Sequence, residues 1–209
     1  NTVGSNSQSF YIGTTSENDS YSGKRYLTVE GGEFACIAGG RGSKASGDDN
    51  TYPTTTAQYV DRNDTTATIR IKKDAIIHGG VYGGAAASPA WSHRKIIITG
   101  GIIEGWVAGG CNGTQNQGYG GRGIGNAYIY VGGNAVIGGE TPHTIPNANN
   151  VPGTIGGNVF GTGRGSYGGE EVPSSMENSY VVIADHCDIL HSVYGGGNLG
   201  RVFEGEGNA

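Results

Sequence analysis

The chain has 209 residues, 42 of them glycine, with 15 % charged residues and a formal net charge of −5. So much glycine would destabilise a helical protein at interior positions, and a collagen would need glycine at every third position and far more than 6 prolines. The 32 isoleucines and valines, against 3 leucines, favour an all-β protein. The negative charge argues against a nucleic-acid partner, and no apolar run is long enough to predict a membrane-spanning segment.

The N-terminal segment, residues 1–24, differs in composition from the rest of the chain. It is rich in serine, asparagine and threonine, and we expect it to form a cap or lead-in that protects the first strand of a repetitive domain. The domain itself is expected to span residues 25–209. Residues 205–209 show no capping pattern, so we expect that the domain was cut there or continues in a longer chain.

Residues 25–209 repeat one pattern five times. A strand in which apolar residues alternate is followed by a glycine-flanked valine or isoleucine, as in the segment GGVYGG at residues 79–84. In the first copy Leu27 and Val29 share one face and Thr28 lies on the other, which is typical of a half-buried strand. The equivalent positions in the five copies are Val29, Ile71, Ile98, Val131 and Ile183.

Successive equivalent positions are separated by 42, 27, 33 and 52 residues. The shortest interval suits one coil of a parallel β-solenoid, and the longer ones predict loops inserted at a corner. We therefore predict an all-β, parallel and right-handed β-helix of about five coils with irregular loops. An antiparallel barrel or sandwich stays as the alternative, although two-residue hairpin signals are few. The inserted loops are expected at residues 43–66, 112–126, 140–156 and 166–178.

Two sets of aromatic residues recur at fixed places in the pattern. Tyr82, Phe160 and Tyr194 follow the repeated valine, and Tyr26, Tyr128 and Tyr180 lie at the start of the long strands. Alternation predicts that both sets point to the outside of the coils. Their rings could then bind the apolar faces of sugars, with asparagine side chains and glycine backbone amides as hydrogen-bonding neighbours. The alternative is a ladder of self-stacking rings that only stabilises the solenoid.

Three arginines, Arg41, Arg122 and Arg164, each lie between two glycines after a predicted corner. If these loops stack, they place a line of guanidinium groups along one edge, able to pair with carboxylates or sulfates. The alternative is that they are ordinary solvated loop residues.

Candidate catalytic carboxylates are present but form no recognisable constellation. They are Asp74, Glu104, Asp185 and Asp188, and a glycosidase would need two of them facing each other. We interpret the segment 185–188 as a replacement for the glycine corner of the fifth copy, with Asp185 and Asp188 making turn hydrogen bonds. The sequence therefore predicts no catalytic residue.

No metal or other cofactor is predicted. His78 and His191 lie near matching positions before the repeated valine, but no third ligand at a metal-binding spacing accompanies them. The three cysteines, Cys36, Cys111 and Cys187, lie far apart and form no CxxC pair, so we interpret them as small buried hydrophobic residues.

The segments GGVYGG (79–84) and VYGGGNLG (193–200), each preceded by an Ile/Val strand, resemble the glycine-rich VYGGG repeats of large secreted, adhesin-like proteins of gut bacteria. The resemblance covers residues 25–203 and implies a β-solenoid, an extracellular or cell-surface location, and adhesion. The irregular spacing departs from the more regular repeats of those proteins. We therefore expect a non-catalytic structural or adhesive module whose partner is a host or dietary glycan or a surface protein.

Two other functions stay open. The first is a polysaccharide-active β-helix enzyme of the pectate-lyase or polygalacturonase type: Arg70-Ile71-Lys72 matches one short polygalacturonase motif, but the other motifs of that group are missing. The second is a segment of a phage fibre or spike, which shares the architecture. The sequence leaves the oligomeric state open.

Overall fold

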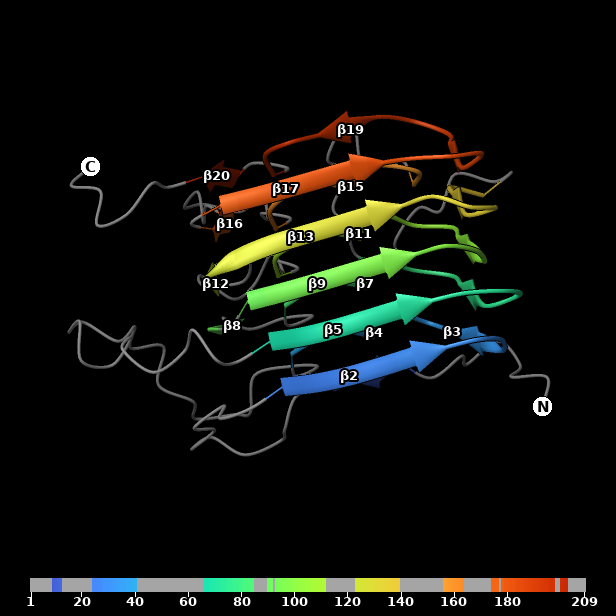
Figure 1. Ribbon diagram of the computed structural model, residues 1–209, viewed down its shortest axis with the longest axis horizontal. Helices are drawn as coiled ribbons and strands as arrows, with labels where there is room; N and C mark the ends of the chain where they lie inside the picture. Colours follow the sequence, from blue (N-terminus) through green and yellow to red (C-terminus); the bar gives the residue numbers. More distant parts are fainter. Residues whose placement is uncertain are drawn as a thin grey trace, which may run out of the picture.

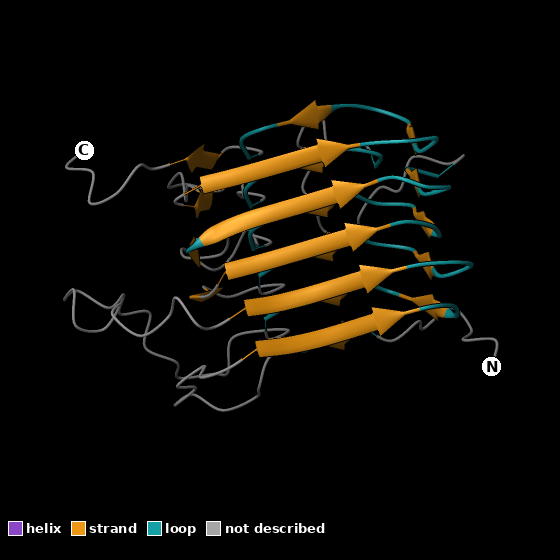
Figure 2. Ribbon diagram, viewed as in Figure 1, coloured by secondary structure: helices purple, strands orange, loops and turns teal. Residues whose placement is uncertain are grey.

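The computed structural model describes residues 9–12, 24–40, 66–84, 90–91, 93–111, 123–139, 156–163, 174–176, 178–197 and 200–202. All regular structure in these ranges is β-strand (Figure 2). No helix in the described part of the chain is long and apolar enough to cross a membrane.

Three parallel sheets form the body of the molecule. The long sheet contains one six-residue strand from each repeat: β2 (Lys24–Val29), β5 (Thr66–Ile71), β9 (His93–Ile98), β13 (Asn126–Val131) and β17 (Asn178–Ile183). The corner sheet contains two-residue strands: β3 (Glu33–Phe34), β6 (Ile76–Ile77), β10 (Ile102–Ile103), β14 (Val136–Ile137) and β18 (Asp188–Ile189). The glycine sheet contains β1 (Phe10–Tyr11), β4 (Ile37–Ala38), β7 (Val81–Tyr82), β11 (Val107–Ala108), β15 (Val159–Phe160) and β19 (Val193–Tyr194).

Two further strand pairs lie outside the three sheets. They are β8 (Ala90–Trp91) with β12 (Gly123–Ile124), and β16 (Ser174–Met176) with β20 (Gly200–Val202). In the chain, β8, β12 and β16 each precede a long strand, and β20 follows the last strand of the glycine sheet.

Each of the five coils runs in chain order through a long strand, a corner strand and a strand of the glycine sheet. In Figure 1 the long strands run from left to right in front, the chain returns behind them, and successive coils rise, which makes the solenoid right-handed. Every strand pair is parallel, including the register Ile69↔Ile96 and Ile129↔Val181 between long strands. The predicted parallel solenoid of about five coils is therefore confirmed, and the antiparallel alternative is wrong.

The first strand, β1, pairs with β4 at the outer edge of the glycine sheet. Within residues 1–24 only 9–12 and Lys24 are described, and Lys24 already belongs to β2. The cap or lead-in at residues 1–24 stays a prediction.

The core is a stack of β-branched side chains that point inward from all three sheets. Ile71, Ile98 and Val131 lie in register on the long sheet and are completely buried. Burying each such side chain contributes about 1.5–3 kcal/mol, and the parallel register brings identical positions together in each coil. This is why isoleucine and valine dominate the composition.

Glycines form a ladder at the corner that follows the glycine sheet. A Cβ added to Gly39, Gly83, Gly109 or Gly161 would collide with the carbonyl oxygen of the equivalent glycine in the next coil. The backbones of successive coils approach too closely there for any side chain. The glycine after each valine–aromatic pair is therefore a steric requirement of the stacking.

The corner between long and corner strands contains a left-handed residue in every coil. It is a glycine in three coils, and Lys73 (φ 54°) and Asp185 (φ 58°) take this conformation in the second and fifth coils. Asp185 thus occupies the corner as predicted. Asp188 does not, because it begins β18. The predicted turn hydrogen bonds are not formed: the Asp185 carboxylate accepts a hydrogen bond from Tyr130 of the neighbouring coil, and Asp188 lies outside the turn.

Candidate ligand-binding face

The long sheet presents one outer surface, which we call the long-sheet face. It consists of the residues of β2, β5, β9, β13 and β17 that alternate with the inward core residues. Strand register aligns them in three rows across the sheet. The first row is Lys24, Thr66, His93, Asn126 and Asn178; the second is Tyr26, Thr68, Lys95, Tyr128 and Tyr180; the third is Thr28, Arg70, Ile97, Tyr130 and Val182.

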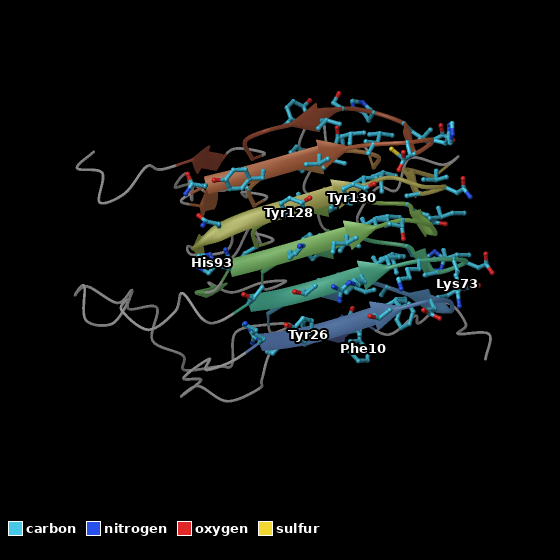
Figure 3. All side chains as sticks on the ribbon, in the orientation of Figure 1. Phe10, Tyr26, Lys73, His93, Tyr128 and Tyr130 are labelled. Atoms are coloured by element: carbon cyan, nitrogen blue, oxygen red, sulfur yellow. The ribbon has the colours of Figure 1, made fainter. Side chains whose placement is uncertain are left out.

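Four tyrosines lie on this face. Tyr26 is 61 % exposed and Tyr180 is 54 % exposed, and Tyr128 and Tyr130 are half-buried. Figure 3 shows Tyr26, Tyr128 and Tyr130 on the outer side of the same sheet. Because the strands are about 4.8 Å apart, Tyr128 and Tyr180 are direct neighbours. The set Tyr26, Tyr128 and Tyr180 therefore points outward, as predicted.

Polar contacts link neighbouring strands on the same face. The Nδ2 of Asn178 donates a hydrogen bond to Oδ1 of Asn126 (2.9 Å), and the backbone amide of Asn126 donates to Nδ1 of His93 (3.0 Å). The ammonium of Lys95 lies 4.9 Å from the centre of the Tyr128 ring, a cation–π contact. These contacts pre-organise side chains on a rigid sheet, which lowers the entropy cost of binding.

Tyr130 lies where the face meets the corner. Its hydroxyl donates a hydrogen bond to Oδ2 of Asp185 (3.2 Å). Desolvation, together with the hydrogen bond to this carboxylate, raises the pKa of Tyr130 above its ordinary value. Because the hydroxyl hydrogen is donated to Asp185, the Tyr130 oxygen can only accept a further hydrogen bond.

The second aromatic set corrects a prediction. Tyr82 and Phe160 point away from the main core, as alternation requires, but they are only 4 % and 6 % exposed. They belong to a second apolar cluster with Ala38, Trp106 and Ala108. Outward direction therefore does not mean exposure on the glycine sheet, and Tyr82 and Phe160 are structural residues.

Tyr194, the third member of this set, stacks on Phe160 with ring centres 5.3 Å apart. It is 46 % exposed, and it belongs to the last coil that the structure describes. Trp106, which the repeat pattern does not single out, has its ring centre 6.3 Å from the ring centre of Tyr82. Its equivalent in the coil below is Gly80, and the pairing of a tryptophan with a glycine was the clue in the sequence. A Cβ on Gly80 would contact both the Tyr82 hydroxyl and Trp106 Nε1, so only a glycine leaves room for the two rings.

The predicted arginine line lies outside the described residues. Arg41, Arg122 and Arg164 are all in segments that the structure does not describe, so their role stays a prediction.

A cluster of titratable groups lies at the corner sheet. Nδ1 of His78 is 2.9 Å from Oε2 of Glu104, and Nε2 is 3.4 Å from Oε2 of Glu33. The three residues belong to three successive coils and are each about one-third exposed. The hydrogen bond to the Glu104 carboxylate, followed by the charge of Glu104 and by Glu33, raises the pKa of His78 above its ordinary value. Protonated His78 would connect the two carboxylates.

The other histidines and carboxylates of the described residues form no cluster that could hold a metal ion. In the stacked coils His78 is level with Glu104, Gly138 and Leu190, and His191 lies one position later, where its backbone amide donates to the carbonyl of Gly157. The two histidines therefore occupy near-matching positions, as predicted, and are offset by one residue. Within the described ranges, no three histidine, cysteine or acidic residues are arranged to hold a metal ion.

The cysteines form no disulfide bond with one another. Cys111 is completely buried, Cys187 packs against the main core, and Cys36 packs against the second apolar cluster. The interpretation as a small buried hydrophobic residue is confirmed for Cys111, whereas Cys36 and Cys187 are only partly buried.

Comparison of the chain with protein-family models, with curated proteins and with solved structures found no match to any of them.

Proposed function

We propose that this chain is a non-catalytic, secreted or cell-surface adhesive module that binds glycan through the long-sheet face. The observation that supports this most directly is the group of four tyrosines on one rigid face, two of them more than half exposed. Exposed tyrosines provide apolar contact area with a hydroxyl at the rim, which suits ligands that are polar at the edge and apolar on the face.

The neighbours of the tyrosines suit the same ligand. Asn126 and Asn178 provide amide donors and acceptors beside Tyr128 and Tyr180 in the adjacent row. Sugar hydroxyls need such groups, and a polysaccharide chain can lie across several strands at once. A face that extends over five neighbouring strands favours an extended glycan over a small molecule, which would need a concave pocket.

A glycan-array experiment tests the proposal. The purified chain is screened beside Tyr26→Ala and Tyr180→Ala, with Tyr194→Ala as the matched control: an exposed tyrosine of similar accessibility on a different sheet. We expect either face variant to weaken binding about tenfold, equivalent to about 1.4 kcal/mol, and the control to bind like the unmodified chain. Absence of binding to every glycan, or equal losses in all three variants, contradicts the proposal.

The second candidate function is a polysaccharide-active enzyme, and the cluster of Glu33, His78 and Glu104 is the observation that favours it. A histidine between two carboxylates is a plausible acid–base group. Incubation of the chain with polysaccharides, followed by measurement of new reducing ends, tests it. Product formation that His78→Gln abolishes would support the enzyme, and no product would leave the binding function.

A further inference from the structure

We infer that the long-sheet face selects anionic glycans, whose sugars carry carboxylate or sulfate groups. The inference rests on the proposed glycan-binding function and specifies its ligand. The supporting observation is the distribution of charge over the molecule. The three rows of the face contain Lys24, Arg70 and Lys95 together with His93, and contain no aspartate or glutamate. The chain as a whole has a formal net charge of −5.

Carboxylates of the described residues gather elsewhere, at the corners and on the corner sheet. They are Glu30, Glu33, Asp74, Glu104, Asp185 and Asp188. The salt bridges follow the same division: Lys72 and Lys73 pair with Glu30, and His78 pairs with Glu33 and Glu104. Cations near the corners are therefore neutralised by the protein itself.

The cations of the face are not neutralised in this way. In the described part of the structure, Lys24, Arg70 and Lys95 form no salt bridge with a carboxylate. The contact of Lys95 is with the Tyr128 ring, which leaves its charge in place. Three positive charges thus lie among tyrosines with no internal counter-ion, and an anionic ligand would supply one.

The spacing of the cations suits repeated negative charges. Arg70 and Lys95 are on neighbouring strands and one row apart, which places their Cα atoms about 8 Å apart by strand geometry. This is close to the Debye length of about 8 Å at physiological salt, so the two charges act on the same segment of a ligand. The guanidinium of Arg70 can bind a carboxylate or a sulfate through two parallel hydrogen bonds.

A single-stranded nucleic acid is also an anion that stacks on aromatic rings, but it suits this face less well. Proteins that bind it follow its backbone with a continuous positive groove. Here the cations are few, and carboxylates of Glu30, Asp74 and Asp185 border the face where the long strands end. A sugar chain with a charge on only some of its units fits this sparse pattern better.

The test compares ligands that differ only in charge. Polygalacturonate is compared with its fully methyl-esterified form, which removes the carboxylate charge. Dextran sulfate is compared with dextran, which lacks the sulfate charge. Oligo(dT) represents nucleic acid. Binding of the full chain is measured by isothermal titration calorimetry at 0.05 and 0.5 M NaCl. The variants are Lys95→Gln and Arg70→Gln, and the matched control is Lys73→Gln, which removes an exposed charge at the corner instead.

We expect at least one charged glycan to bind about tenfold more tightly than its neutral partner, with the difference reduced at 0.5 M NaCl. Lys95→Gln and Arg70→Gln should each weaken this binding about fivefold, and Lys73→Gln should not. Whether the ligand is a uronate or a sulfated sugar is decided by which pair shows the difference. Equal binding of charged and neutral partners overturns the inference and leaves the proposed function intact. Binding of no glycan overturns both, and tighter binding of oligo(dT) replaces the glycan with a nucleic acid.

Discussion

The third and fifth coils of the solenoid repeat the same pattern but differ in burial. Ile98 of the third coil is completely buried, whereas Ile183, its equivalent two coils further on, is 41 % exposed. Likewise Val107 is completely buried and Val193 is 44 % exposed. The residue types and their inward direction are alike, so the difference comes from the neighbours. The third coil has a coil on each side, and among the residues that the structure describes the fifth has a coil on one side only.

This difference shows that a side chain in a solenoid is buried mainly by the coils above and below it. Identical residues therefore contribute unequally to stability according to their place along the axis, as expected for a nearly one-dimensional stack. Substitutions at equivalent positions of interior and terminal coils can measure that inequality.

The largest effect is expected from truncating the buried isoleucine ladder. Ile98→Ala should lower the free energy of unfolding by about 4 kcal/mol, because the cavity lies between two coils that cannot close it. Ile183→Ala should cost about 1.5 kcal/mol, since that side chain already retains much of its contact with water. Urea denaturation followed by circular dichroism measures both, and equal costs would contradict the dependence on position.

The glycine ladder gives the next largest effect. Gly109→Ala should destabilise by about 3 kcal/mol, because its Cβ would collide with the carbonyl oxygen of Gly161 and lie close to Ala127. Gly195→Ala should change stability by less than about 0.5 kcal/mol, because a Cβ on Gly195 meets no atom within 4 Å. Thermal unfolding of the two variants provides the comparison. A Gly195 variant as unstable as the Gly109 variant would show that something else covers the fifth coil.

The sequence predicts the architecture well, because alternation identifies the strands and their faces, and the interval between equivalent valines and isoleucines reports on the length of a coil. It also predicts the outward direction of Tyr26, Tyr128 and Tyr180. It does not predict that Tyr82 and Phe160 are buried. Alternation indicates which way a side chain points, and it does not indicate what packs against that side of a sheet.

The cluster around His78 could not be found from the sequence. Its carboxylates are 45 and 26 residues away along the chain, and only the register of the corner sheet brings them to the imidazole. That register depends on the lengths of corners and loops, which vary from coil to coil. The charge separation between the long-sheet face and the corners has the same origin, since it becomes visible only when the rows are aligned.

Corner glycines allow a second test of the difference between interior and terminal coils. Gly32 in the first coil and Gly101 in the third both have a positive φ, 89° and 83°. Gly32→Ala should cost about 1 kcal/mol from backbone strain alone, because its Cβ would touch only the Phe34 ring at ordinary distance. Gly101→Ala should cost about 1 kcal/mol more, since its Cβ would lie 2.6 Å from the carbonyl oxygen of Ala75 in the coil below. Chemical denaturation that finds equal losses would mean that strain, and not stacking, dominates at this corner.

The smallest expected effect concerns the contact between coils made by His78. Because Glu104 and then Glu33 raise its pKa in the folded state, protonation of His78 stabilises the fold. The contribution is fully present below about pH 6.5, the unfolded value, and is lost as the pH rises through the raised folded pKa. Since the side chain is partly exposed, we expect only about 0.5 kcal/mol.

Urea denaturation of the unmodified chain and of His78→Gln at pH 6 and pH 8.5 measures this contribution. The unmodified chain should lose its advantage over the variant as the pH rises, and His191→Gln, an exposed histidine of the terminal coil, should leave the pH dependence unchanged. Stability that rises with pH only when His78 is present would reverse the sign and show that the cluster prefers a neutral imidazole. A pH dependence that persists in His78→Gln would instead assign it to other groups, and the three coils would then be held together at this corner without help from charge.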